Sequence, residues 1–245
     1  MKTSTPFLIA ALACAVTANA QTQTPKAIPK PIGAIIFEDD FNRSESQEEK
    51  DEPGKGWRTN SEKRAKGNKQ VDLRDGAMHI YIHREADHGV SVVHDAEFTN
   101  GAVGLRFKLE AKDDSLGLNF ADLKFKGVHA GHLFAARIYT DRVVLQDLKT
   151  GRMEKETHAL NKAKKLTAEQ KKALKKKEKS FKNTLEIGKW YNLLVEVEGE
   201  TLSATIDGEK IGSFTSPGIA HPTKRTLRLA VPKNAIVDDV KIWKR

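Results

Sequence analysis

Apolar residues alternate with polar ones between residues 190 and 214, and tight turns interrupt the alternation. One face of the first run carries an apolar side chain at every second position, namely Tyr191, Leu193, Val195 and Val197. Residues 198–200 and 207–208 hold glycines where the pattern breaks, and the alternation resumes after each break. Period-two spacing broken by glycine-containing turns is typical of antiparallel strands joined in sequence. The segment therefore predicts an antiparallel meander.

Short runs of the same kind recur from about residue 71 onward. They predict strands at residues 78–83, 90–98, 103–109, 116–125, 133–139 and 143–148. With four strands expected near the C-terminus, the chain has ten or more short strands and a single convincing helix. This pattern predicts an all-β, jelly-roll sandwich.

The exception to the β pattern is a lysine-rich insert. Ten lysines fall between Lys162 and Lys182, interleaved with two glutamates. Thr167 and Gln170 have the spacing of a capping box, and strong helix formers follow them. We expect one inserted amphipathic helix over residues 167–179 that projects from the sandwich.

The net charge of +9 arises mainly from this insert, because the rest of the chain is close to neutral. The insert has one aromatic residue, Phe181, so it lacks the stacking side chains of a single-strand binder. We therefore expect no specific nucleic-acid partner. Two interpretations remain open: a solvated surface helix, or a basic arm that contacts an acidic polysaccharide.

Residues 1–20 have the features of a secretory signal peptide: a charged start, an apolar stretch and a small-residue cleavage site. The only cysteine, Cys14, lies within this segment, so the mature chain depends on one large core instead of disulfides. A lipoprotein reading of Cys14 fits the preceding residues poorly. We expect an exported protein, periplasmic or extracellular.

The remaining chain divides into a tether and one domain. Residues 21–32 contain three prolines and predict a flexible tether. Residues 33–245 form the sandwich domain, with the insert at residues 161–182. No later run reaches eighteen apolar residues, so we expect no membrane span.

Six residues are candidates for catalysis because their chemistry does not suit the position that the pattern gives them. They are His94, Asp122, His132, Asp147, His221 and Lys224. His94 and Asp122 fall in phase with apolar residues of their strands, where a base or a satisfied core residue is expected. His132 follows a glycine-flanked turn that also holds His129, and Asp147 ends a strand.

His221 and Lys224 lie on a loop that Pro217 and Pro222 stiffen. Such a loop holds polar side chains in place for a ligand, or it uses them to cap a strand. Residues expected on a concave, saccharide-binding face are Tyr81, Arg106, Arg137, Gln146 and Arg228.

Paired carboxylates in the E-x-D-x-x-E spacing of retaining jelly-roll glucanases are absent from the sequence. The acidic doublets at residues 39–40 and 238–239 consist of neighbours, whose side chains point to opposite faces of a strand. An ordinary retaining glycosidase mechanism is therefore not expected.

Four segments carry a resemblance to a known family: residues 37–43, 72–76, 190–208 and 237–240. In these segments the chain resembles the exported concanavalin-like domains grouped as 3-keto-disaccharide hydrolases, loosely labelled family 16 glycoside hydrolases. The resemblance spans residues 33–245. It implies a concanavalin-like jelly roll whose concave face or rim binds carbohydrate, and cleavage of 3-keto-glycosides in some members.

Three functions follow from these observations. The first is a hydrolase or lyase acting on glycosides. In a 3-keto-glycoside the ketone at C3 of the sugar acidifies the proton on C2. Elimination therefore needs one base and one electrophile for the ketone oxygen, and the candidate electrophile is Lys224 or a divalent cation. The second is a non-catalytic glycan-binding or matrix module. The third is an extracellular structural protein that contacts anionic polymers through its lysines.

Overall fold

The computed structural model describes residues 30–245, together with Met1. The predicted signal peptide, Cys14 and most of the predicted tether lie outside these described residues. In the described part of the chain, no helix is long and apolar enough to cross a membrane.

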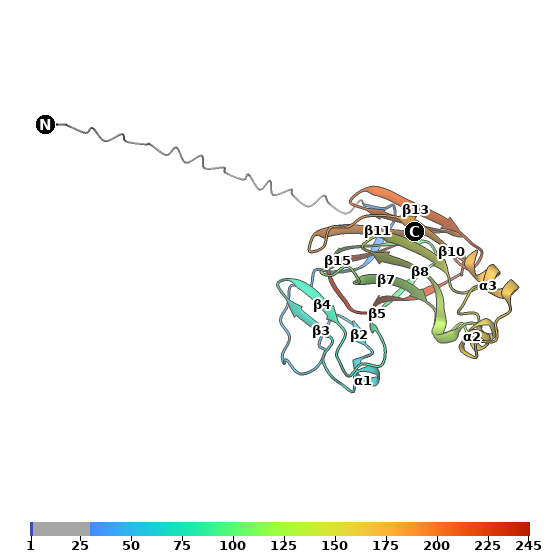
Figure 1. Ribbon diagram of the computed structural model, residues 1–245, viewed down its shortest axis with the longest axis horizontal. Coiled ribbons are helices and arrows are strands. Elements are labelled where there is room, and N and C mark those ends of the chain that lie inside the picture. Colours follow the sequence, from blue (N-terminus) through green and yellow to red (C-terminus); the bar gives the residue numbers. More distant parts are fainter. Residues whose placement is uncertain (2–29) are drawn as a thin grey trace.

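Two antiparallel sheets stack as two layers (Figure 1). Sheet A runs in the order β13 (Glu209–Thr215), β12 (Thr201–Ile206), β11 (Trp190–Glu198), β6 (Gly101–Lys108), β15 (Asn234–Lys244), β4 (Ala77–Tyr81) and β3 (Val71–Arg74), and β1 (Ala34–Asp39) also pairs with β15. Sheet B runs in the order β10 (Glu178–Lys182), β9 (Arg142–Asp147), β8 (His132–Tyr139), β7 (Ser115–Ala121), β14 (Lys224–Val231), β5 (Val90–Phe98) and β2 (Arg58–Thr59). The predicted all-β jelly-roll sandwich is confirmed.

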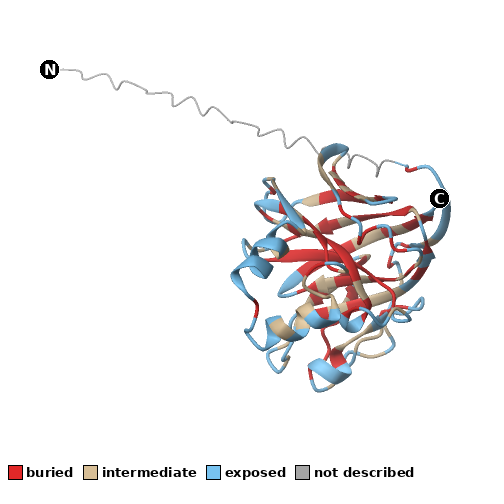
Figure 2. Ribbon diagram, turned by 90° about the vertical axis from the view of Figure 1, so that its right-hand side faces the viewer, coloured by how far each residue is buried: buried red, intermediate tan, exposed pale blue. Residues whose placement is uncertain are grey.

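The core lies between the two sheets, and the buried residues are concentrated on their strands (Figure 2). Fully buried aromatic residues from sheet B pack there, and Phe120 and Phe134 stack with their ring centroids 4.8 Å apart. The predicted meander is present as β11, β12 and β13. At its second turn Asp207 and Gly208 both have positive φ (49° and 81°), the geometry that joins two adjacent strands most tightly.

The lysine-rich insert differs from the prediction of a single helix. α2 (Lys155–Lys162) begins before the insert and ends in it, and the insert itself holds α3 (Ala168–Lys175) and then the edge strand β10. The capping box at Thr167 is present as predicted, but α3 ends at Lys175. β10 pairs with β9 along its whole length, and this backbone hydrogen bonding ends the helical run despite its helix-favouring residues.

A long loop between β1 and β3 precedes the β3–β4 hairpin and contains α1 (Ser61–Arg64). Trp57 anchors this loop, because its side chain is buried and its Nε1 donates to Asp39 Oδ2 at 2.9 Å. Arg43 forms two further bonds to the same carboxylate, at 2.6 and 3.0 Å. Burial alone would raise the pKa of Asp39, but these donors outweigh it and hold that pKa below its usual value.

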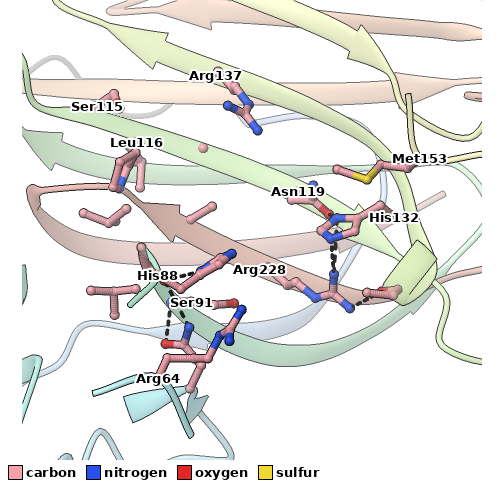
Figure 3. Close-up of a pocket in the computed structure, with 18 of the residues that line it drawn as sticks. Arg64, His88, Ser91, Ser115, Leu116, Asn119, His132, Arg137, Met153 and Arg228 are labelled. Carbon is pink, nitrogen blue, oxygen red and sulfur yellow. Dashed lines mark hydrogen bonds between the residues drawn. The ribbon is translucent and has the colours of Figure 1, made fainter. Parts of the chain in front are cut away.

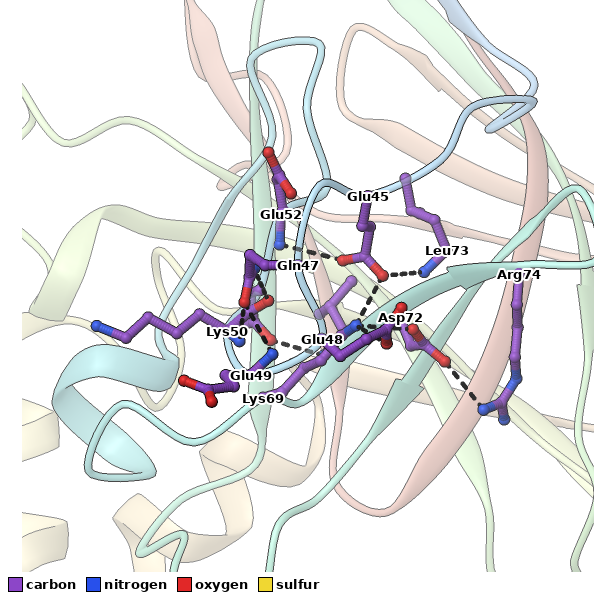
Figure 4. A network of polar contacts seen from close by, with 12 residues as sticks. Glu45, Gln47, Glu48, Glu49, Lys50, Glu52, Lys69, Asp72, Leu73 and Arg74 are labelled. Atoms are coloured by element: carbon purple, nitrogen blue, oxygen red, sulfur yellow. Dashed lines mark hydrogen bonds and ion pairs between the residues drawn. The ribbon is translucent and has the colours of Figure 1, made fainter.

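Lys69 fixes the other end of this loop (Figure 4). Its buried ammonium lies 2.8 Å from Glu45, 2.9 Å from Asp72 and 3.2 Å from Glu48. Glu45 also accepts a hydrogen bond from the backbone of Leu73 at 3.0 Å, which joins the loop to β3. The loop is therefore attached to the sandwich by buried ionic contacts at both ends.

Candidate functional site

A cavity of about 540 Å³ opens on the face of sheet B that points away from sheet A. The sheet residues that line it through polar side chains are Ser91, Ser115, Asn119, His132, Arg137, Tyr139 and Arg228 (Figure 3). Its rim comes from α1 and its N-cap residue Asn60, from residues 88–89, and from the short helix η1 (His129–Gly131). We call this space the sheet B cavity.

Two small residues form part of the cavity floor. Gly117 on β7 lies opposite Ala230 on β14 and opposite Arg137 on β8. Asn119 and Arg228 form the next outward pair of β7 and β14. Because neither Gly117 nor Ala230 carries a long side chain, the floor is open between Arg137 and Arg228.

His132 lies at the start of β8 and contacts Asn119 and Arg228. Its Nδ1 is 3.0 Å from Asn119 Oδ1, and Arg228 Nη1 is 3.3 Å from both of its ring nitrogens. An amide oxygen only accepts, so the contact with Asn119 places the imidazole proton on Nδ1. Burial lowers the pKa of His132 to about 3, and the charges of Arg228, His129 and Arg137 add to this effect. The ring is therefore neutral at physiological pH.

Arginines dominate the electrostatics of the site. Arg228 Nη2 donates to Ala130 O at 2.7 Å, and burial lowers the pKa of its guanidinium. Arg152 lies just outside the cavity, where its Nη2 donates to Gln146 Oε1 at 2.7 Å and its buried Nε has no hydrogen-bond partner in the structure. Burial first, and then the charge of Arg137, lower the pKa of Arg152. Three guanidiniums therefore share a partly desolvated region.

Carboxylates do not contribute to this lining. Among the described residues that line the sheet B cavity, none is aspartate or glutamate. Across residues 30–245, no group of three or more His, Cys, Asp or Glu side chains is placed to hold a metal ion. The divalent cation considered as an electrophile therefore has no such ligand group in the described chain.

The structure brings together only some of the residues that the sequence singles out. His132, Arg137 and Arg228 line the sheet B cavity, whereas Gln146 lines a neighbouring cavity, where it accepts a hydrogen bond from Arg152. The other predicted residues lie elsewhere.

Tyr81 and Arg106 do not share a face with these residues, because β4 and β6 belong to sheet A. Arg106 pairs with Asp238 at 3.0 Å, and its guanidinium lies over the Trp190 ring at 4.9 Å. The expectation of one face containing all five binding residues is therefore wrong. The chain passes from one sheet to the other at several points, for example from β5 in sheet B to β6 in sheet A, so outward residues of different strands can point to opposite sides of the molecule.

Asp122 and His221 form a buried pair at 3.1 Å. Burial alone would raise the pKa of Asp122, but the hydrogen bond from His221 and the other donors hold it below its usual value. Burial also lowers the pKa of His221, although Asp122 opposes this shift. The pair fixes the proline-stiffened loop to the end of β7, and neither residue lines the sheet B cavity.

Lys224 and Asp147 are also buried, each with 1% of its surface exposed. Lys224 Nζ donates to Thr99 O at 2.6 Å and to His221 O at 2.8 Å. Asp147 accepts from Ser216 Oγ at 2.5 Å and from Gly218 N at 3.0 Å. These contacts join strands and loops, and the catalytic roles predicted for the two residues gain no support from them.

His94 packs beneath the long loop, stacked on Phe37 with ring centroids 3.6 Å apart. Its ring nitrogens lie 2.7 Å from Asp95 O and 3.1 Å from Lys55 O. It does not line the sheet B cavity, so the six catalytic candidates do not converge there.

Sequence reasoning missed Asn119 and Arg152. Asn119 could have been found, because it faces outward from β7 in the same phase as the small Gly117. Arg152 follows β9 within a turn, where no periodic pattern indicates the direction of a side chain.

No protein-family model matches the sequence, and no curated protein matches it. Solved structures do match. A non-specific endo-beta-1,3(4)-glucanase from family GH16 has a TM-score of 0.57 at 14% identity, covering 90% of this chain and 94% of that one. The laminarinase catalytic domain from Thermotoga maritima gives 0.55 at 11% identity, covering 87% and 98%. The carbohydrate binding module CBM66 from Bacillus subtilis gives 0.51 at 12% identity, covering 77% and 96%. These similarities establish a concanavalin-like fold.

Proposed function

We propose that this protein binds a saccharide in the sheet B cavity. The observation that carries the proposal is a hollow of about 540 Å³ on one sheet face, with polar side chains around an open floor. Its volume lies within the range of roughly 300–1,000 Å³ that is usual for small-ligand sites. Both glycosidases and a carbohydrate-binding module share the fold, which supports a saccharide as the ligand.

Binding without turnover fits the cavity better than hydrolysis does. Most glycosidases use two carboxyl groups, about 5–5.5 Å apart or about 6.5–9.5 Å apart. No carboxylate lines the sheet B cavity among the described residues. Elimination from a 3-keto-glycoside would need only one base, and of the three histidines that line the cavity (His88, His129 and His132) His132 is the one that contacts both Asn119 and Arg228. A group whose pKa lies near 3 is a weak proton acceptor at neutral pH, however.

The test is calorimetric titration of the whole protein with neutral and acidic oligosaccharides and with 3-keto-disaccharides, followed by product analysis. We expect binding with no product formed. Ala230→Leu, which fills the floor, should abolish binding, and the matched exposed variant Ala159→Leu on α2 should bind normally. If Ala230→Leu binds every tested sugar as tightly as the natural protein does, the cavity is not the binding site. Turnover of a 3-keto-disaccharide would refute the non-catalytic assignment.

We also propose that the protein is exported, on the basis of its signal-like first twenty residues. Sequencing the N-terminus of protein from the native host should give Gln21 as the first residue. A mature protein that retains Met1 would contradict export by this route.

A further inference from the structure

We propose that the saccharide in the sheet B cavity is anionic, carrying a carboxylate or a sulfate ester. This inference rests on the proposed function and specifies its ligand. It places recognition of acidic sugar in the cavity itself, whereas the sequence alone points to the lysine-rich insert.

The charges that line the cavity have one sign. Its fixed cations are Lys63, Arg64, Arg137 and Arg228, and no aspartate or glutamate is among the described lining residues. Arg64 is paired with Asp87 at 3.3 Å, but both side chains are substantially exposed and Asp87 does not line the cavity. A concave, single-sign surface of this kind raises the local concentration of ligands of the opposite charge.

The two central arginines lack an ionic partner in the described part of the chain. No carboxylate lies within ion-pair distance of Arg137 or Arg228, and Arg137 has no hydrogen bond to another side chain or to the backbone there. Arg228 bonds only to neutral groups, the His132 ring and Ala130 O. Lys69 and Arg106 have carboxylate partners, and the buried Lys224 donates to two backbone carbonyls. Arg137 has neither kind of partner among the described residues.

Desolvation of these cations is unfavourable unless an anion compensates it. Burial lowers the pKa of Arg228 and of Arg152, which means that the charged form is disfavoured at both positions. Burying an unpaired charge destabilises a protein, whereas a charge-assisted bond to a carboxylate or sulfate oxygen recovers part of that loss. The unpartnered Nε of Arg152 is one more donor in the same region.

The spacing of the arginines suits a sugar unit. Arg137 and Arg228 are offset by two strands and two residues, which places their Cα atoms about 12 Å apart. The open floor of Gly117 and Ala230 lies between them. A sugar ring above this floor can present its acidic group to one guanidinium fork and its hydroxyls to neutral donors and acceptors such as Asn119.

The experiment compares acidic and neutral oligosaccharides of the same backbone and length. One arm uses oligogalacturonate against galacto-oligosaccharide, and the other uses sulfated galactan fragments against the same fragments desulfated. Calorimetric titration at low and high salt measures each affinity. We expect one acidic ligand to bind at least about tenfold more tightly than its neutral counterpart, more so at low salt. The arm that shows this preference identifies the acidic group as a carboxylate or a sulfate.

Variants test the cavity against general charge attraction. Arg228→Gln and Arg137→Gln should each weaken acidic-ligand binding about 10- to 100-fold and reduce the preference for the acidic over the neutral ligand. Arg74→Gln is the matched control, since it removes the same charge from an exposed arginine on β3 and should change nothing. Acidic binding that survives both cavity variants would overturn the inference, as attraction to the surface then suffices.

The remaining outcomes separate the two proposals. Equal binding of acidic and neutral ligands, lost in Ala230→Leu, would overturn the anionic inference and leave the proposed function standing. If no ligand of either arm binds, and no other neutral sugar binds either, the proposed function is refuted and the inference with it.

Discussion

Lys224 provides a test of whether the buried polar residues near the proline-stiffened loop are structural. Its ammonium is enclosed, and it donates to two backbone carbonyls, Thr99 O and His221 O. Burial, and then the charge of Lys149, lower its pKa from 10.5 to about 8. The prediction concerns the variant Lys224→Met, which keeps an apolar chain of similar length and removes the titrating group.

The sign of the effect follows from proton binding. Between pH 8 and 10.5 the unfolded chain holds a proton on Lys224 that the folded protein has released, so stability rises with pH. Below pH 8 the full cost of about 3 kcal/mol applies, because one pKa unit corresponds to about 1.4 kcal/mol. Integrating between pH 7.5 and 9.5 gives a gain of about 2 kcal/mol for the natural protein. Lys224→Met cannot show this gain.

The assay is urea unfolding of both proteins at pH 7.5 and at pH 9.5. Comparing the two proteins at each pH removes the contribution of every other titrating group. With a slope of about 2 kcal/mol per molar urea, the difference between their midpoints should move by roughly 1 M. The exposed Lys210→Met is the control and should show no such movement. A midpoint difference that is the same at both pH values would refute the assignment of Lys224 as a buried ammonium with a lowered pKa.

Three other variants test the attachment of the long loop and the reach of the binding surface. Lys69→Met leaves buried carboxylates unpaired and should lower the free energy of unfolding by about 3 kcal/mol, measured by urea unfolding. Trp57→Phe removes the donor to Asp39 and should cost about 1–3 kcal/mol in the same assay, whereas an unchanged midpoint would contradict that hydrogen bond. The double variant Lys171→Gln/Lys175→Gln alters a neighbouring cavity that Arg152 and Gln146 also line. It should weaken binding of long acidic chains about three- to tenfold and leave acidic disaccharides unaffected, measured by calorimetry.

Local patterns in the sequence are sufficient to predict much of the fold. The alternation in β12 follows directly from one buried and one less buried face, so it can be recognised in the sequence without tertiary information. The capping box at Thr167 is equally local, since its two bonds join residues three positions apart. The strand β10 could not be predicted in this way, because its side chains are mostly exposed and its hydrogen bonds are made with β9.

The location of the site depended on information that alternation does not contain. Period-two spacing separates inward from outward side chains, but it does not say which of two outer faces an outward residue occupies. Arg106 and Arg137 both face outward, yet one lies on sheet A and the other on sheet B. Only the pairing order of the strands distinguishes them, and that order arises from contacts between residues far apart in the sequence.

Polar residues at inward positions and polar residues at outward positions carry different information about function. An inward polar group is stable only when the protein supplies its partners, and Asp147 and Asp122 each have several. Such residues break the local pattern, yet their partners account for them. An outward cation can instead use solvent, so a half-buried one without a carboxylate, as Arg228 is, keeps a charge that its contacts with Ala130 O and His132 do not neutralise. The unpaired outward arginines are therefore better evidence for a ligand than the histidine and lysine of the proline-stiffened loop.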